Sequence, residues 1–333
     1  MRTASVVLSF LQRSLQVQGP FRKSIKSFST YSTTREFEEI QVSVPWGHIA
    51  GKWYGPKDKR PLVGFHGWQD NAGTFDTLAP LLPQHIGFLS IDLPGHGLSS
   101  WLPHGSSYHS IDQLNIYFRL MNEFKWDKIS MISHSMSAAD GFVFTSLFPD
   151  KCDLFIAVDL VQPLLGKKEL SIKMITDQFE SYNKQIELSL QKSEPPTYEF
   201  DKLVERMTKA NGDSILREYY ELILKRNIKP SKEDPNKYYF SRDPQLKSMS
   251  FTIFPNDILV EMAHKITCPH LFITAKRARH YDSEEELKEV MDAFRKNPHF
   301  ENHVVDGTHY VHLNEPHKIA EIVNPFIMKY RPE

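Results

Sequence analysis

The stretch Lys128-Ile-Ser-Met-Ile-Ser-His-Ser-Met-Ser-Ala-Ala-Asp140 runs from a short apolar segment into small, helix-forming residues. This order predicts a strand, a sharp turn that carries Ser135, and a helix. A nucleophile elbow has this layout, because its serine stands at the end of a strand in a strained turn with a helix N-terminus behind it. Glycine usually lies two residues to each side, where strand and helix approach closely. Ser133 and Ser137 fill these positions here, so the rest of the chain has to corroborate the elbow.

The composition is that of an ordinary globular protein. The chain has 333 residues, of which 40% are hydrophobic and 24% charged, so it can bury one large core or two modest ones. A formal net charge of -1 gives no broad attraction to nucleic acid or to an anionic membrane, which favours a small-molecule partner. The two cysteines, Cys152 and Cys268, lack the spacing of metal ligands. We therefore expect no metal and no cofactor, and the absence of a run of about 18 apolar residues argues against a transmembrane span.

The first 35 residues differ in composition from the rest of the chain. They contain no Asp or Glu but six basic residues and seven serines, and the first acid is Glu36. This is the composition of a mitochondrial transit peptide. Two other interpretations are a secretory signal, with Val6–Leu11 as its apolar part, and a disordered basic tail. We predict a transit peptide over residues 1–35 and a mitochondrial protein, with the cytoplasm or the peroxisome as alternatives, and exclude this segment from the fold.

Eight short runs have the apolar content or the alternation of β-strands. The first two are predicted to form an antiparallel hairpin, because Pro45-Trp-Gly47 turns the chain between them. The later runs alternate with segments of helical spacing, which predicts parallel strands joined by helices. The runs are Glu38–Val44, His48–Tyr54, Pro61–His66, Gly87–Asp92, Ile129–Ile132, Cys152–Leu160, His270–Ala275 and Phe300–Val305.

Helical spacing of apolar residues marks the connecting segments. The expected helices lie around Phe75–Leu82, over Ser110–Met121 with Ser110 as its cap, from the serine turn to about Phe148, over Ser283–Lys296 and near Glu315–Tyr330. Between 161 and 266 the sequence changes to long amphipathic stretches rich in Lys and Glu, which predicts an all-helical insertion. We expect a core of residues 36–160 and 267–333 and a helical cap over 161–266.

The segment Phe65-His-Gly-Trp-Gln-Asp-Asn-Ala-Gly73 follows the third predicted strand. An open parallel sheet carries its working residues at the carboxyl ends of its strands. Acyl transfer requires two backbone N–H groups directed at the developing oxyanion, one from the residue after the nucleophile and one from this loop. Met136 and Trp68 are the candidate oxyanion donors. A simple tight turn at His66-Gly67 is the alternative interpretation.

A serine hydroxyl needs a base within hydrogen-bond reach. The last predicted strand runs into Val305-Asp-Gly-Thr-His-Tyr-Val-His-Leu-Asn-Glu-Pro316, in which His309 follows a glycine turn. The chain order of serine and then histidine fits this architecture. His312 and His317 compete for the role, but they lie three and eight residues further on and are better explained as supporting or surface residues. We therefore take His309 as the base.

A carboxylate has to hold the imidazole in the correct tautomer. It is expected two or three residues after the seventh strand, but that place reads Ala275-Lys-Arg-Ala-Arg-His-Tyr-Asp-Ser283, and its first acid is Asp282. Asp159, at the end of the sixth strand, can also reach the histidine, although it could instead cap or pack the start of the insertion. We favour Asp159 and keep Asp282 as the alternative.

Two further charged motifs are better explained by structure than by chemistry. In Asp92-Leu-Pro-Gly-His-Gly-Leu-Ser99 the glycines and the proline indicate a loop with unusual backbone angles, so a catalytic Asp92–His96 pair is the less favoured interpretation. Arg242-Asp243 resembles a buried or capping ion pair in the insertion, with substrate contact as the alternative.

These motifs together resemble the α/β-hydrolase superfamily, through His66-Gly67, Asp92-x-Pro-Gly-His-Gly-x-Ser99, the Ser135 turn and Gly307-x-His309. More narrowly, His66-Gly-Trp-x-Asp-Asn-Ala-Gly73, Ser241-Arg-Asp-Pro244 and His309-Tyr-Val-His-Leu-Asn-Glu-Pro316 resemble the serine hydrolase-like protein family. The resemblance covers about Glu38 to the C-terminus. It implies an α/β-hydrolase fold, with a mostly parallel eight-stranded sheet flanked by helices, a lid domain and hydrolase activity.

We therefore predict a serine hydrolase that cleaves a carboxylic ester or thioester of a small molecule through an acyl-enzyme. Ser135, His309 and Asp159 would form the catalytic triad, and the N–H groups of Trp68 and Met136 the oxyanion hole. The alternative is a small-molecule binding protein of the same fold with weak or no catalysis, which the serine-flanked elbow permits. The sequence leaves the acyl and alcohol groups and the oligomeric state open.

Overall fold

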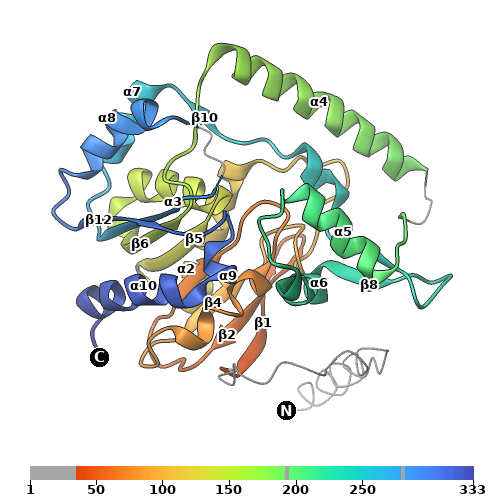
Figure 1. Ribbon diagram of the computed structural model, residues 1–333, viewed down its shortest axis with the longest axis horizontal. Coiled ribbons are helices and arrows are strands. Elements are labelled where there is room, and N and C mark those ends of the chain that lie inside the picture. The colour runs from red at the N-terminus through yellow and green to blue at the C-terminus, as the bar shows by residue number, and fades with distance from the viewer. Residues whose placement is uncertain (1–34, 192–194, 279–281) are drawn as a thin grey trace. The chain divides into compact units, whose positions relative to one another are not determined.

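A computed structural model of the chain describes residues 35–191, 195–278 and 282–333 (Figure 1). The predicted transit peptide, residues 1–35, lies outside the described residues except for Arg35, and it stays a prediction. Arg35 itself belongs to the folded unit, because its guanidinium donates to the carbonyl oxygen of Ile86 over 2.8 Å.

A single eight-stranded sheet organises the described core, with the strand order β1-β2-β4-β3-β5-β6-β11-β12. Only β1 with β2 and β2 with β4 pair antiparallel, and the remaining neighbours are parallel. The predicted mostly parallel eight-stranded sheet is confirmed, and each predicted strand agrees with an observed one to within two residues at either end. The strands are β1 (Phe37–Val44), β2 (Gly47–Tyr54), β3 (Leu62–Phe65), β4 (Phe88–Ile91), β5 (Ile129–His134), β6 (Cys152–Val158), β11 (His270–Ala275) and β12 (Phe300–Val305).

Helices cover both faces of this sheet (Figure 1). Helices α2 (Leu114–Phe124), α3 (Met136–Leu147), α7 (Asn256–His264) and α8 (Glu284–Phe294) pack on one face. Helix α10 (Pro316–Tyr330) packs on the other, after the short helix α9 (Val311–Asn314). Strands that are covered on both sides need apolar residues at every position. The central strands therefore appear in the sequence as continuous apolar runs.

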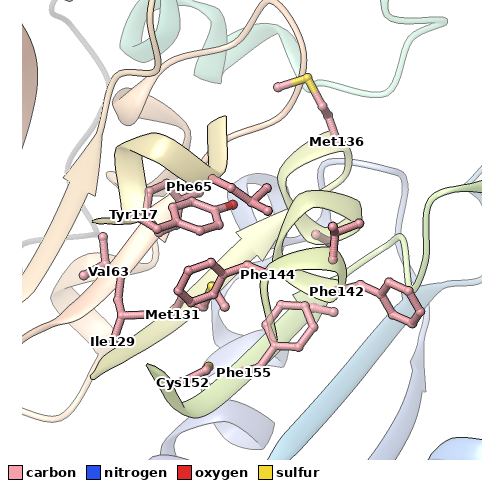
Figure 2. Close-up of a cluster of buried hydrophobic side chains, with 14 of the residues drawn as sticks. Val63, Phe65, Tyr117, Ile129, Met131, Met136, Phe142, Phe144, Cys152 and Phe155 are labelled. Carbon is pink, nitrogen blue, oxygen red and sulfur yellow. The ribbon is translucent and has the colours of Figure 1, made fainter. Parts of the chain in front are cut away.

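An aromatic cluster attaches α2 and α3 to the sheet (Figure 2). The ring of Tyr117 on α2 lies 4.5 Å from that of Phe65 on β3 and 5.1 Å from that of Phe144 on α3, measured between centroids. Met131 of β5 and Phe155 of β6 belong to the same cluster and are fully buried. Because interiors pack at the density of organic crystals, this contact holds α2 and α3 in place against the sheet.

Two predicted helices differ from the structure. The segment around Phe75–Leu82 forms two 3-10 turns, η2 (Ala72–Phe75) and η3 (Ala79–Leu81), because prolines 80 and 83 remove backbone donors that an α-helix would need. Ser110 does not cap α2. It opens the 3-10 turn η4 (Ser110–Gln113), and its hydroxyl lies 2.9 Å from the hydroxyl of Thr252.

The segment between β6 and β11 is helical but not all-helical. It holds α4 (Lys168–Leu190), α5 (Phe200–Ala210), η6 (Arg217–Tyr219), α6 (Tyr220–Asn227) and η7 (Pro244–Ser248). It also holds two strand pairs, β7 (Leu164–Leu165) with β10 (Ile253–Phe254) and β8 (Ile228–Pro230) with β9 (Tyr238–Phe240). Pairs this short have no periodicity that a sequence pattern could show. Helix α7 lies inside the predicted cap range 161–266, yet it packs on the core.

A buried ion network joins the insertion to the sheet. The guanidinium of Arg226 on α6 contacts the Asp92 carboxylate at 2.7 Å and also the Glu39 carboxylate on β1. Burial opposes the charge of Arg226, but the two carboxylates raise its pKa above the ordinary value. Asp92 also accepts the backbone N–H groups of Ala72 (2.8 Å) and Leu98 (2.9 Å). The network therefore holds α6 and the loops after β3 and β4 in one arrangement.

His270 makes the core sensitive to acid. Its buried ring stacks on Phe155 at 4.8 Å and meets Phe294 at 4.7 Å, and neither ring nitrogen has a hydrogen-bond partner among the described residues. Burial lowers the pKa of His270 to about 3. An unfolded histidine titrates near 6.5, so the unfolded chain gains a proton that the folded chain refuses, and stability is lost as the pH falls below about 6.5.

The wild-type protein should lose stability between pH 7.5 and pH 5. We predict that this loss is about 2 kcal/mol smaller in His270→Phe. Urea unfolding at the two pH values measures the difference. His264→Phe is the matched control, because it removes a histidine that is exposed to solvent. Equal pH dependence of wild type and His270→Phe would contradict the prediction.

Candidate active site

Ser135 lies in the turn between β5 and α3. Its backbone has φ 53° and ψ -121°, a conformation that non-glycine residues rarely adopt. All of β5 is buried, and the first residue of α3, Met136, follows directly. This strained strand-to-helix turn is the geometry of a nucleophile elbow.

His309 and Asp159 complete a hydrogen-bonded chain with Ser135. The Nε2 atom of His309 lies 2.9 Å from the Ser135 hydroxyl oxygen, and its Nδ1 atom lies 2.6 Å from Oδ2 of Asp159. The side chain of Asp159 is 1% exposed, and its Oδ1 atom accepts the backbone N–H of Ala275 over 2.7 Å. A carboxylate can only accept at Nδ1, so Nδ1 carries the proton and Nε2 is left to accept one from Ser135.

Sheet order explains why Asp159 reaches His309. Strands β5, β6, β11 and β12 are consecutive and parallel, so the residues that follow them gather at one edge of the sheet. Asp159 follows β6 with φ 59°, and its N–H donates to the carbonyl oxygen of Ile273 on β11 over 2.8 Å. His309 lies in the loop between β12 and α9.

The other candidate residues lie elsewhere. The Asp282 carboxylate forms an ion pair with Lys167 at 3.4 Å and accepts a hydrogen bond from the side-chain amide of Gln162 at 3.5 Å. His312 is buried on α9, and its Nε2 atom lies 2.9 Å from the Thr74 hydroxyl. His317 is exposed in the first turn of α10. Asp159 is therefore the carboxylate that contacts His309.

The loop after β3 runs directly against the elbow. A Cβ atom on Gly67 would lie 3.2 Å from the Cβ of Ser135, so only glycine fits comfortably there. Trp68 is anchored from the other side, because its indole N–H donates to the carbonyl oxygen of Leu246 over 2.7 Å. Met136 opens α3, and the first N–H groups of a helix have no acceptor within the helix. The two candidate oxyanion donors thus flank the serine.

Two neutral histidines support this loop. The Nε2 atom of His66 accepts the N–H of Leu93, and the Nε2 atom of His96 accepts the N–H of Gln69, both over 3.0 Å. Burial lowers the pKa of His66 to about 4 and that of His96 well below its ordinary value. A neutral ring can accept at Nε2, whereas a charged one cannot. His96 therefore supports the loop after β3, and Asp92 supports the ion network, so both residues of this motif have structural contacts.

Sequence reasoning missed His134. Its ring is fully buried under the site, with its centroid 4.6 Å from that of His309 and 4.2 Å from that of His312. Its Nε2 atom lies 2.9 Å from the carbonyl oxygen of His309. Burial lowers the pKa of His134 well below its ordinary value. The sequence signal for His134 was its position at the end of a central strand, directly before Ser135. Alternate residues of such a strand face the same helical layer, so a histidine there is expected to be buried next to the serine turn.

The serines that replace the elbow glycines are both buried, and they differ in their contacts. The Ser137 hydroxyl donates to the carbonyl oxygen of His66 over 2.5 Å, and so connects α3 to the loop after β3. The Ser133 hydroxyl has no hydrogen-bond partner among the described residues. The elbow thus keeps its positive φ with serine on both sides.

The described ranges hold no group of three His, Cys, Asp or Glu side chains placed to bind a metal ion. None of the helices in these ranges is long and apolar enough to cross a membrane.

Comparison with known proteins places this geometry in a family. The family described as alpha/beta hydrolase fold matches residues 60–316. The chain belongs to this family. A probable serine hydrolase of Drosophila melanogaster is 31% identical to the hydrolase over 304 residues, which are 89% of this chain and 88% of the fly protein. A serine hydrolase-like protein of Mus musculus is 30% identical over 301 residues, 87% of this chain and 95% of the mouse protein. The resemblance seen in the motifs is confirmed.

Solved structures show the same fold. A hypothetical protein of Pseudomonas aeruginosa PAO1 superposes with a TM-score of 0.72 at 24% identity and covers 89% of this hydrolase and 100% of its own chain. A thioesterase domain from the curacin biosynthetic pathway superposes with a TM-score of 0.70 at 19% identity, covering 86% and 99%.

The two flanking serines of the elbow should differ in their effect on stability. We predict that Ser137→Ala lowers the free energy of unfolding by about 1–2 kcal/mol, because the buried His66 carbonyl loses its donor. Ser133→Ala should be neutral or slightly stabilising, because it removes a buried hydroxyl without a partner. Urea unfolding measures both. A larger loss in Ser133→Ala than in Ser137→Ala would refute this assignment of the contacts.

Proposed function

We propose that this hydrolase cleaves a carboxylic ester or thioester through an acyl-enzyme formed on Ser135. The observation that carries the proposal is the continuous hydrogen-bonded chain from the strained Ser135 through His309 to the buried Asp159. Structural likeness to a thioesterase domain and to proteins named esterases is compatible with either bond.

The proposed steps follow this chain of contacts. The Ser135 oxygen attacks the acyl carbon while its proton passes to Nε2 of His309, and the N–H groups of Trp68 and Met136 stabilise the oxyanion. His309 then gives the proton to the departing alcohol or thiol, and the acyl group stays on Ser135. In the second half of the cycle, water attacks the acyl carbon while its proton passes to Nε2 of His309. The proton then returns to the Ser135 oxygen, and the carboxylic acid is released. Asp159 accepts the hydrogen bond from Nδ1 of His309 and stabilises the imidazolium that forms twice in each cycle.

A binding protein of this fold is the rival function. Such a protein would have no need to keep a serine at positive φ, which costs about 1–3 kcal/mol, within 2.9 Å of a histidine that is oriented by a buried carboxylate. Epoxide hydrolases and dehalogenases use a carboxylate nucleophile on this scaffold, and Ser135 argues against that chemistry.

A fluorophosphonate probe separates the two functions, because it reacts covalently only with an activated serine. We expect wild-type protein to be labelled and Ser135→Ala to remain unlabelled when both are resolved on a gel. The matched control is Ser133→Ala, which removes a nearby hydroxyl outside the hydrogen-bonded chain and should still be labelled. Labelling of Ser135→Ala, or none of the wild type, would sink the proposal.

Separate replacement of each candidate acid by asparagine tests the role of Asp159. Asp159→Asn should lower kcat for a 4-nitrophenyl ester by about 10³–10⁴-fold, because an amide at this place favours the wrong imidazole tautomer. Asp282→Asn should leave kcat within about twofold, because Asp282 contacts Lys167 and Gln162 instead of His309. Comparable losses in both variants would refute the triad.

A further inference from the structure

A pocket in the insertion is lined by positive charge. It has a volume of ≈ 420 Å³ and lies between α5 and η7. This size falls in the range of small-molecule sites, about 300–1,000 Å³. Apolar walls come from residues such as Met207 and Phe240. Four cations line it, Arg206, Lys209, Arg242 and Lys247, against a single acid, Asp243.

Positive charge is in excess in this pocket. Within residues 35–191, 195–278 and 282–333, no ion pair is formed by any of the four cations. Asp243 is committed elsewhere, because its carboxylate accepts the Tyr108 hydroxyl over 2.7 Å and the N–H of Gln245 over 2.9 Å. The predicted Arg242–Asp243 ion pair is not formed, but the predicted capping role is confirmed for Asp243, whose carboxylate caps η7.

The cations also repel one another. Burial lowers the pKa of Lys247, and the charges of Arg242, Arg206 and Lys184 lower it further. Such a cluster costs free energy in the empty protein, and a bound anion would relieve both the repulsion and the lack of partners. Charge-assisted hydrogen bonds of this kind are among the strongest that proteins form.

Arg242 connects the pocket to the catalytic end of the sheet. Its guanidinium lies over the Phe240 ring at 4.3 Å, and Nη2 donates to the side-chain oxygen of Gln69 over 3.0 Å. Its Nη1 atom is buried and has no hydrogen-bond partner in the described part of the chain. Gln69 follows Trp68, whose indole is bonded to Leu246 on η7. The pocket therefore borders the loop that holds a candidate oxyanion donor.

We propose that this pocket binds an anionic group, a phosphate or a carboxylate, carried by the substrate away from the bond that is cleaved. The inference rests on the proposed function, and it narrows the substrate class to negatively charged esters or thioesters. Arg242 is the least exposed of the lining cations, and Arg206 and Lys247 supply charge at the exposed rim.

Three thioesters with the same acyl group test this proposal. S-Butanoyl-N-acetylcysteamine is neutral, S-butanoyl-3-mercaptopropionate carries a carboxylate, and S-butanoyl coenzyme A carries phosphates. Thiol release gives kcat/KM for each, and the two anionic thioesters distinguish the two kinds of anion. We expect wild-type protein to prefer at least one anionic thioester over the neutral one by about tenfold or more.

Two double variants show whether the pocket causes the preference. Arg206→Gln/Lys247→Gln should reduce the ratio of anionic to neutral kcat/KM by about tenfold. The control Lys202→Gln/Arg217→Gln removes the same charge from the same insertion, at exposed residues paired with Glu205 and Asp201, and should leave the ratio unchanged. No preference in wild type, or an equal loss of preference in both double variants, would overturn the proposal.

Binding to an inactive protein separates this inference from the proposed function. Calorimetric titration of Ser135→Ala with S-butanoyl coenzyme A and S-butanoyl-3-mercaptopropionate should show binding of an anionic thioester that weakens about tenfold when Arg206→Gln/Lys247→Gln is added. Such binding without hydrolysis by wild type would support the pocket and refute the hydrolase. Hydrolysis of the neutral thioester alone, without binding of either anionic one, would refute the pocket and support the hydrolase.

Discussion

The site depends on two strained turns at the ends of neighbouring strands. Ser135 follows β5 and Asp159 follows β6, and both have positive φ without being glycine. Each conformation costs about 1–3 kcal/mol and persists only where the surroundings determine it. The surroundings here are the packed helices on both faces of the sheet and the loop at Gly67. The rigid core thus carries the strain that directs a hydroxyl and a carboxylate toward the same imidazole.

Around these turns several buried polar groups are paired. Neutral His66 and His96 accept backbone N–H groups, and Arg226 balances the charge of Asp92. In a medium of low polarity such a network is strong when satisfied and costly when broken. The loops around Ser135 are therefore held by directional bonds as well as by apolar packing. The same low pKa values that keep these histidines neutral make the fold sensitive to acid.

The pattern of the sequence was sufficient for the sheet, and less so for the segments that cover it. The central strands could be predicted because burial on both faces of the sheet leaves an apolar run bounded by turns. The segment around Phe75–Leu82 has helical spacing, but its prolines leave only 3-10 turns. Ser110 looked like a helix cap because serine favours that position, yet a tertiary contact with Thr252 uses its hydroxyl. Short strand pairs in the insertion carry no local signal.

The sequence alone determined the residues whose roles depend on local order. Ser135 is marked by the strand and helix that flank it, and His309 by a glycine turn after the last strand. Tertiary structure decided the rest. Asp159 and Asp282 were both possible acids until the pairing of β6 with β11 placed one of them 2.6 Å from the imidazole. The cationic pocket likewise joins Arg206, Arg242 and Lys247 from separate elements. Contacts between residues so distant along the chain are set by strand order and packing, which local patterns do not contain.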